Sequence, residues 1–160
     1  MKKDIITIYT DGAARGNPGP AGWGAVIFVD GEKFETGGRS HKATNNQMEL
    51  SGPIGALIFL KKLASQPTPT GREFAKNIEI FSDSKYVIFG ITEWIFNWQK
   101  NDWRNAAKKP VLNKELWVEL YSLSKNFNIK WTYVKGHAGF EWNERADVIA
   151  TSFADNEPVI

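Results

Sequence analysis

The chain has 160 residues, about the size of one domain, and contains no cysteine, which excludes disulfides and thiolate metal sites. Its formal net charge of +2 favours no class of partner, and 42% of hydrophobic residues is enough to build a core. No apolar run reaches the roughly 18 residues of a membrane span, and the N-terminus lacks the apolar stretch of a signal peptide. We therefore expect a single cytoplasmic domain over residues 1–160, with no membrane segment.

The first part of the chain is typical of several strands followed by a helix. Apolar and β-branched runs predict strands over residues 5–10, 23–29 and 32–37. Residues 12–24, rich in Gly, Pro and Asn, predict a turn, and Asp30-Gly31 predicts a hairpin. Apolar residues at helical spacing predict a helix over residues 44–63, with Thr44 as its N-cap.

The second part alternates strands with helices. We expect a strand over residues 77–82 and short helices from Ser84 onward. A helix over 113–126, a strand over 129–134 and a last helix capped by Asn143 follow. Strands that alternate with helices after an initial hairpin predict an α/β fold, with a five-stranded mixed sheet flanked by helices.

Four acidic side chains lie where an apolar run ends or a polar helix face begins: Asp11, Glu49, Asp83 and Asp147. Each alone has an ordinary explanation, because Asp is common in turns and a carboxylate in the first turn of a helix favours the helix dipole. If the four converge, their mutual repulsion demands a cation, since an unpaired buried charge is costly. Hard oxygen ligands suit Mg²⁺ or Mn²⁺, and such a set is typical of metal-assisted phosphodiester cleavage.

Two further segments carry candidate functional residues. His137 is flanked by Gly136 and Gly139, which predict a loop that moves, and an imidazole that titrates near neutral pH can relay protons. Residues 94–109 combine tryptophans with Lys and Arg, and such side chains bind bases, sugars and phosphates of nucleic acids. The alternative, that tryptophans pack one helix on another, is at least as good for Trp98 and Trp103.

Several segments in this order resemble the bacterial-type ribonuclease H family, type 1, over almost the whole chain. The similar segments are residues 10–20, 44–50, 82–87, 135–139 and 143–147. The resemblance implies a ribonuclease H-like fold and an endonuclease that cuts the RNA strand of RNA–DNA hybrids, leaving 5′-phosphate and 3′-hydroxyl ends. It also implies that Asp11, Glu49, Asp83 and Asp147 bind two Mg²⁺ ions, with Mn²⁺ as a substitute. His137 would then assist the attacking water or the departure of product.

The resemblance also implies contacts with both strands of a hybrid. Positions on the RNA-strand side are matched by Asn17, Asn45, Asn46 and Lys85, although some relatives have Gln in place of Lys85. A phosphate pocket for the DNA strand is matched by Thr44 and Asn113, with Lys42 adding charge. The groove for the DNA strand is matched by Trp94 and Trp117. The family's basic protrusion is matched by Lys100, Arg104, Lys108 and Lys109.

Two other functions compete with this interpretation. A DNA-cutting resolvase or transposase domain shares the acidic ligands, but it lacks the amide set of Asn17, Asn45 and Asn46. A non-catalytic hybrid-binding module would have lost at least one carboxylate, and all four are present. We expect a monomer with no obligate protein partner and with no separate hybrid-binding module before Ile5.

Overall fold

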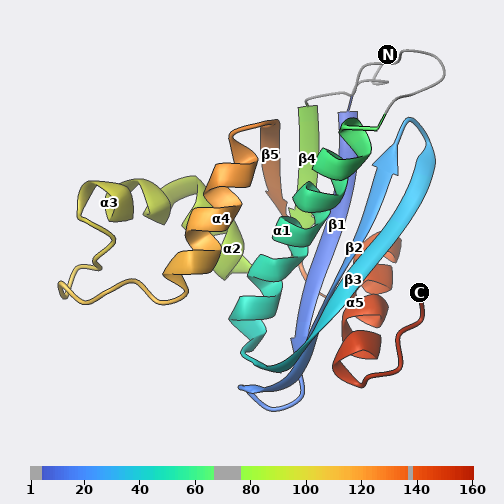
Figure 1. The fold of residues 1–160 in the computed structure, drawn as a ribbon, viewed down its shortest axis with the longest axis horizontal. Coiled ribbons are helices and arrows are strands. Elements are labelled where there is room, and N and C mark those ends of the chain that lie inside the picture. The colour runs from blue at the N-terminus through green and yellow to red at the C-terminus, as the bar shows by residue number, and fades with distance from the viewer. Residues whose placement is uncertain (1–4, 67–76, 137–138) are drawn as a thin grey trace.

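The computed structural model describes residues 5–66, 77–136 and 139–160, and its centre is a five-stranded sheet in the order β3-β2-β1-β4-β5 (Figure 1). The strands are β1 Ile5–Ala14, β2 Gly19–Val29, β3 Glu32–Ala43, β4 Asn77–Ser82 and β5 Asn128–Tyr133. β1, β2 and β3 are antiparallel, whereas β4 is parallel to both β1 and β5. The predicted five-stranded mixed sheet is therefore confirmed.

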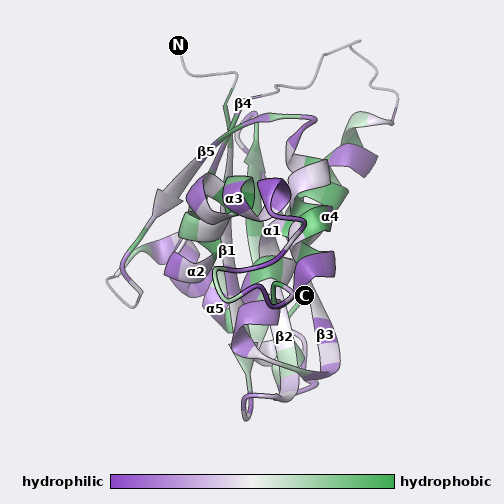
Figure 2. Ribbon diagram, turned by 90° about the vertical axis from the view of Figure 1, so that its left-hand side faces the viewer, coloured by the Kyte–Doolittle hydropathy of each residue, from purple (hydrophilic) through white to green (hydrophobic). Residues whose placement is uncertain are grey.

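Helices pack on both faces of this sheet. They are α1 Asn45–Ala64, α2 Lys85–Phe89, a π-helical turn η1 Gly90–Trp94, α3 Ile95–Lys100, α4 Lys114–Ser124 and α5 Glu141–Ala154. The main core lies between the sheet, α1 and α4, and includes Ile8, Leu57 and Trp117. A smaller core under α5 contains Val26 and Ile149. Figure 2 shows hydrophobic residues on α4 and hydrophilic residues along much of α5, which buries only a narrow stripe.

Three strands, β1, β2 and β3, are longer than the sequence predicts, and glycines that predict a turn lie inside them. Residues 12–24 do not form one turn, since β1 continues to Ala14 and β2 begins at Gly19. A Cβ on Gly22 would lie 2.3 Å from the carbonyl oxygen of Ala150, and one on Gly24 would lie 2.6 Å from that of Ala146. These glycines therefore allow α5 to approach the sheet closely. β3 likewise continues beyond residue 37 to Ala43, pairing with β2 along its length.

The N-terminal cap of α1 is the residue that the sequence predicts, whereas the cap of α5 is not. Thr44 is the N-cap of α1 as predicted, because its hydroxyl accepts from the backbone N–H of Gln47 while the Gln47 side chain accepts from the N–H of Thr44. Asn143 is not a cap, since α5 begins at Glu141 after an extended Phe140. Asn143 consequently lies inside the helix, one turn before Asp147 and on the same face.

An ion pair holds α5 against the sheet. The guanidinium of Arg145 donates to both carboxylate oxygens of Glu35 on β3, at 2.7 and 3.0 Å. This pair lowers the pKa of Glu35 and is half-buried, so that it orients α5 on the sheet. Within the described ranges, no helix is long and apolar enough to cross a membrane.

Candidate metal centre and substrate surface

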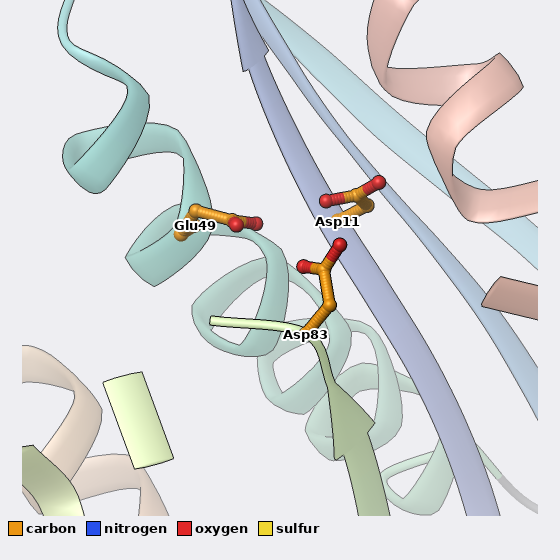
Figure 3. Close-up of side chains that lie close together, drawn as sticks. All are labelled: Asp11, Glu49 and Asp83. Atoms are coloured by element: carbon orange, nitrogen blue, oxygen red, sulfur yellow. The ribbon is translucent and has the colours of Figure 1, made fainter. Parts of the chain in front are cut away.

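Three carboxylates from different elements converge at one end of the sheet. Asp11 lies on β1, Glu49 on α1 and Asp83 directly after β4, and Figure 3 shows their side chains pointing toward one another. One oxygen from each lies within 4.8 Å of the others. Asp147 on α5 lines the same small pocket as Asp11 and Asp83. The structure therefore brings together all of the acidic residues that the sequence singled out.

The strand register explains why Asp11 and Asp83 are neighbours. Tyr9 of β1 pairs with Phe81 of the parallel strand β4. Asp11 and Asp83 each follow two residues later, so both carboxylates reach the same edge of the sheet. Because the carboxyl ends of adjacent parallel strands open together, they form a natural crevice for a ligand.

Gly12 brings Glu49 to this pair. A Cβ at Gly12 would lie 2.5 Å from the backbone nitrogen of Glu49 and 2.5 Å from the carbonyl carbon of Met48. Only glycine therefore lets the backbone of α1 lie against β1 at this point. This close approach places the Glu49 side chain beside Asp11.

Asp11 and Glu49 are buried, and within the described part of the chain neither forms an ion pair. Asp11 is 8% exposed and Glu49 is 6% exposed. Glu49 Oε1 and Asp83 Oδ1 are buried without a hydrogen-bond partner, and no ion pair between described residues involves any of the four acids. Asp11 Oδ1 accepts from the backbone N–H of Gly12 at 2.9 Å. A buried set of unpartnered oxygens fits a hard divalent cation such as Mg²⁺.

The pKa values of the carboxyl groups also agree with a site for a divalent cation. The pKa of Asp11 is raised to about 8, chiefly by burial and then by the negative charge of Asp83. The pKa of Glu49 is also raised well above its ordinary value, again by burial first and then by Asp11 and Asp83. Without a cation the cluster therefore holds protons, and a divalent cation would displace them.

These shifts give a testable pH dependence. Between the ordinary Asp pKa of 3.8 and about 8, the folded protein binds more protons at Asp11 than the unfolded chain does. The free energy of unfolding of the metal-free protein should therefore fall as the pH rises from about 4 to about 8. Glu49 acts in the same direction. Urea unfolding in EDTA at several pH values will measure this dependence, and excess Mg²⁺ should weaken it. A stability that rises over this range would contradict the assignment.

The residues matched to the RNA-strand side lie around the start of α1. Asn17, in the β1–β2 turn, accepts from the backbone N–H of Asn45 at 2.8 Å, which ties the turn to the helix. Asn45 and Asn46 are exposed. Lys85 is exposed at the start of α2, with its Nζ 5.6 Å from the ring centroid of Tyr133. His137 lies outside the described residues.

A hydrogen-bond network joins the two residues matched to the phosphate pocket, Thr44 and Asn113. Gln47 bonds to Thr44 and also donates from its Nε2 to Asn113 Oδ1 at 3.2 Å. Asn113 Nδ2 in turn donates to the hydroxyl of Tyr86 at 3.1 Å. Gln47 and Tyr86 were not singled out from the sequence, since only the fold reveals that they bridge distant segments. Lys42 lies nearby in sequence, exposed near the end of β3.

The prediction that Trp117 contacts substrate is wrong. Its side chain is completely buried, and its indole N–H donates to the Tyr86 hydroxyl at 3.1 Å. Trp117 is therefore a core residue that supports Tyr86. Trp94, by contrast, is 40% exposed and lies edge-on to Tyr86. Trp98 and Trp103 pack against the main core, as the alternative interpretation proposed.

The basic segment surrounds a surface cavity. The cavity has a volume of about 650 Å³ and is lined by Trp94, Asn97, Trp98, Asn101, Arg104, Asn105, Ala106 and Lys108. Arg104 donates to the carbonyl of Lys108 at 3.0 Å, which shapes the loop. Lys100 and Lys109 are exposed in the same segment. Arg104 and Lys108 therefore share the lining of this cavity with Trp94.

A mixed five-stranded sheet with an acidic cluster just beyond the point where the parallel pairing of β1 and β4 ends defines a ribonuclease H-like α/β protein. The family model described as RNase H matches residues 3–155. A ribonuclease H of Bradyrhizobium diazoefficiens is 50% identical over 147 residues, covering 91% of this chain and 87% of the relative. One of Thermosynechococcus vestitus is 46% identical over 156 residues, covering 97% and 92%.

Among solved structures, the crystal structure of LC11-RNase H1 in complex with an RNA/DNA hybrid is similar, with a TM-score of 0.70 and 27% identity. The similarity covers 94% of this chain and 97% of that one. The chain therefore belongs to the RNase H family, in its bacterial type 1 branch, and is a ribonuclease H enzyme.

Proposed function

We propose that the protein is an endonuclease that hydrolyses the RNA strand of RNA–DNA hybrids with two Mg²⁺ ions, leaving 5′-phosphate and 3′-hydroxyl ends. The observation that carries this proposal is the convergence of buried carboxylates in a member of the RNase H family. The related LC11-RNase H1, whose structure contains an RNA/DNA hybrid, supports the choice of substrate.

Each of the acidic residues has its own role in the proposed metal site. Asp11, Glu49 and Asp83 would hold Mg²⁺ through their converging carboxylates, and Asp147, which lines the same pocket, would add a further ligand. When bound, Mg²⁺ supplies a Lewis acid that lowers the pKa of an attacking water and neutralises charge on the scissile phosphate. The family resemblance implies that His137 would receive or deliver a proton during the reaction. Mn²⁺ can replace Mg²⁺, because it accepts the same oxygen ligands.

Recognition of a hybrid requires one surface for each strand. On the RNA side, the side chains of Asn17, Asn45 and Asn46 offer donors and acceptors for 2′-hydroxyl groups, and Lys85 offers a charge to a phosphate. On the DNA side, the network of Thr44, Gln47 and Asn113 holds one phosphate, and the exposed Lys42 adds positive charge. The cations at Lys100, Arg104, Lys108 and Lys109 contact further phosphates next to Trp94.

A cleavage comparison tests the function. End-labelled RNA–DNA hybrid, duplex RNA and duplex DNA of one sequence are incubated with the protein in Mg²⁺ or in EDTA. We expect cleavage only of the RNA strand of the hybrid, and only with Mg²⁺. Cleavage of duplex DNA would favour the resolvase-like alternative. Hybrid binding without any cleavage would favour the binding module.

Removing cations from the basic segment should weaken hybrid binding and its salt dependence. Replacing Lys100, Lys108 and Lys109 by Gln spares Arg104, which shapes the loop. Each lost phosphate contact should reduce the slope of log affinity against log salt by about 0.7–0.9. Adding an Arg104 replacement should extend the effect, while turnover at saturating hybrid changes much less.

The matched control removes the same charge elsewhere. Lys61, Lys62 and Lys125 are exposed and lie outside the basic segment. Replacing these by Gln should leave the slope nearly unchanged. Equal slopes for wild type and the basic-segment variant, measured by titration at several salt concentrations, would place the substrate on another surface.

A further inference from the structure

Asn143 is half-buried overall, but its amide group is buried. Both Nδ2 and Oδ1 are buried and have no hydrogen-bond partner among the residues that the structure describes. Leaving both groups of an amide unpaired in the interior is costly, so such a group calls for a physical reason. Capping the helix is not that reason, because α5 begins at Glu141.

The position of Asn143 suggests what pairs with it. Asn143 lines the same pocket as Asp11, Asp83 and Asp147. It lies one turn before Asp147, on the same face of α5. The carboxamide therefore faces the acidic cluster rather than the core.

The polar groups that line the pocket and its small volume both indicate that a water molecule occupies it. A cation alone would satisfy Oδ1 but leave the Nδ2 donor unpaired. An anion is disfavoured, because the carboxylates that line the pocket outnumber Lys135. A water molecule both donates and accepts. The pocket has a volume of about 10 Å³, which is roughly what one water molecule requires.

We propose that Asn143 is a positioning residue that holds one water molecule between α5 and the carboxylates of the metal centre. When Mg²⁺ is bound beside Asp147, this water would be available as a further ligand, and the carboxamide would orient it. The inference rests on the metal site of the proposed function. It adds to that site a neutral carboxamide, which can accept and donate hydrogen bonds without altering the charge of the site.

Asn143→Leu tests this role, because leucine has a similar size and offers no hydrogen bond. The first readout is Mg²⁺ affinity measured by calorimetry without substrate, which should fall by about 10–100-fold, as for other groups that orient metal ligands. The second is urea unfolding in EDTA, whose midpoint should stay equal or rise, since buried unpaired polar atoms are removed. With hybrid and saturating Mg²⁺, kcat should fall and KM should change little.

Two further variants make the result decisive. Asn143→Ala leaves space for additional water, so it should lose less Mg²⁺ affinity than Asn143→Leu does. Thr151→Val removes a hydroxyl from the same helix that bonds to the carbonyl of Asp147 but does not line the pocket, and it should leave Mg²⁺ affinity unchanged. If Asn143→Leu and Asn143→Ala both destabilise the metal-free protein and bind Mg²⁺ like wild type, Asn143 is only structural and the inference is wrong. Absence of hybrid cleavage by wild type, with Mg²⁺ affinity still dependent on Asn143, would instead overturn the proposed function alone.

Discussion

Replacing Asp11 by Asn should abolish hybrid cleavage and at the same time make the metal-free protein more stable. The change removes a charge with almost no change in volume, at a side chain that is only 8% exposed. In the folded protein, burial and the negative charges of Asp83 and Asp147 disfavour the ionised form of this carboxyl group. The loss of that repulsion should raise the free energy of unfolding by about 1–3 kcal/mol, a range typical for a poorly paired buried polar group.

Cleavage activity should fall by at least about 10³-fold. This is the upper end of what the loss of one hydrogen-bond donor to the transition state costs an enzyme, and a metal ligand should matter at least as much. Turnover of labelled hybrid and urea unfolding in EDTA at pH 8 measure the two effects. At pH 5 the stability difference should shrink, because Asp11 is protonated there in the folded protein. Asp155→Asn is the control, since this exposed carboxylate pairs with Arg15 and faces no metal centre. Near wild-type turnover by Asp11→Asn would refute the two-metal proposal.

Gly12→Ala should damage both stability and the metal centre. The new Cβ would lie 2.5 Å from backbone atoms of Met48 and Glu49, which cannot turn aside as a flexible side chain can. The helix α1 must therefore move away from β1. Overpacking of this kind costs about 1–3 kcal/mol, and sometimes more. Because Glu49 moves with the helix, Mg²⁺ affinity should fall as well.

Gly31→Ala separates this effect from a general cost of replacing glycine. Gly31 has a φ of +81° in the β2–β3 hairpin, and a Cβ there would contact nothing within 4 Å. Its replacement should cost some stability through backbone strain but leave Mg²⁺ affinity unchanged. Calorimetric titration of both variants provides the comparison. Wild-type affinity in Gly12→Ala would mean that close packing at β1 does not position Glu49.

The strands and the acidic cluster could be predicted because their signals are local. The β-branched run at residues 5–10 lies in β1, and residues 77–82 coincide with β4. The placement of Asp11 and Asp83 follows from these strand ends, provided that the two strands are parallel neighbours. That pairing cannot be read from composition, and it first becomes visible in the structure.

The incorrect predictions concern residue types that can serve two physical roles. Glycine allows both turns and close backbone contact, so Gly22 and Gly24 predicted a turn while they actually accommodate α5. Tryptophan can line a groove or fill a core, and only the bond from Trp117 to Tyr86 distinguishes these roles. Asn143 resembles a helix cap in sequence, but the helix begins earlier and turns its amide toward the acids. The roles of the individual substrate contacts and of His137 stay predictions.

The acidic ligands come from different layers of the molecule, which links metal binding to assembly of the fold. Glu49 belongs to the helical layer of α1, Asp11 and Asp83 to the sheet, and Asp147 to α5 on the opposite face. A partly unfolded form in which α5 has left the sheet would lack Asp147 and the Arg145–Glu35 pair. If the four acids bind Mg²⁺ as proposed, the ion should bind such a form more weakly and by mass action select fully docked molecules. Amide hydrogen exchange in α5 should therefore slow as Mg²⁺ is added, even though the proposed ligand Asp147 belongs to a single turn of that helix.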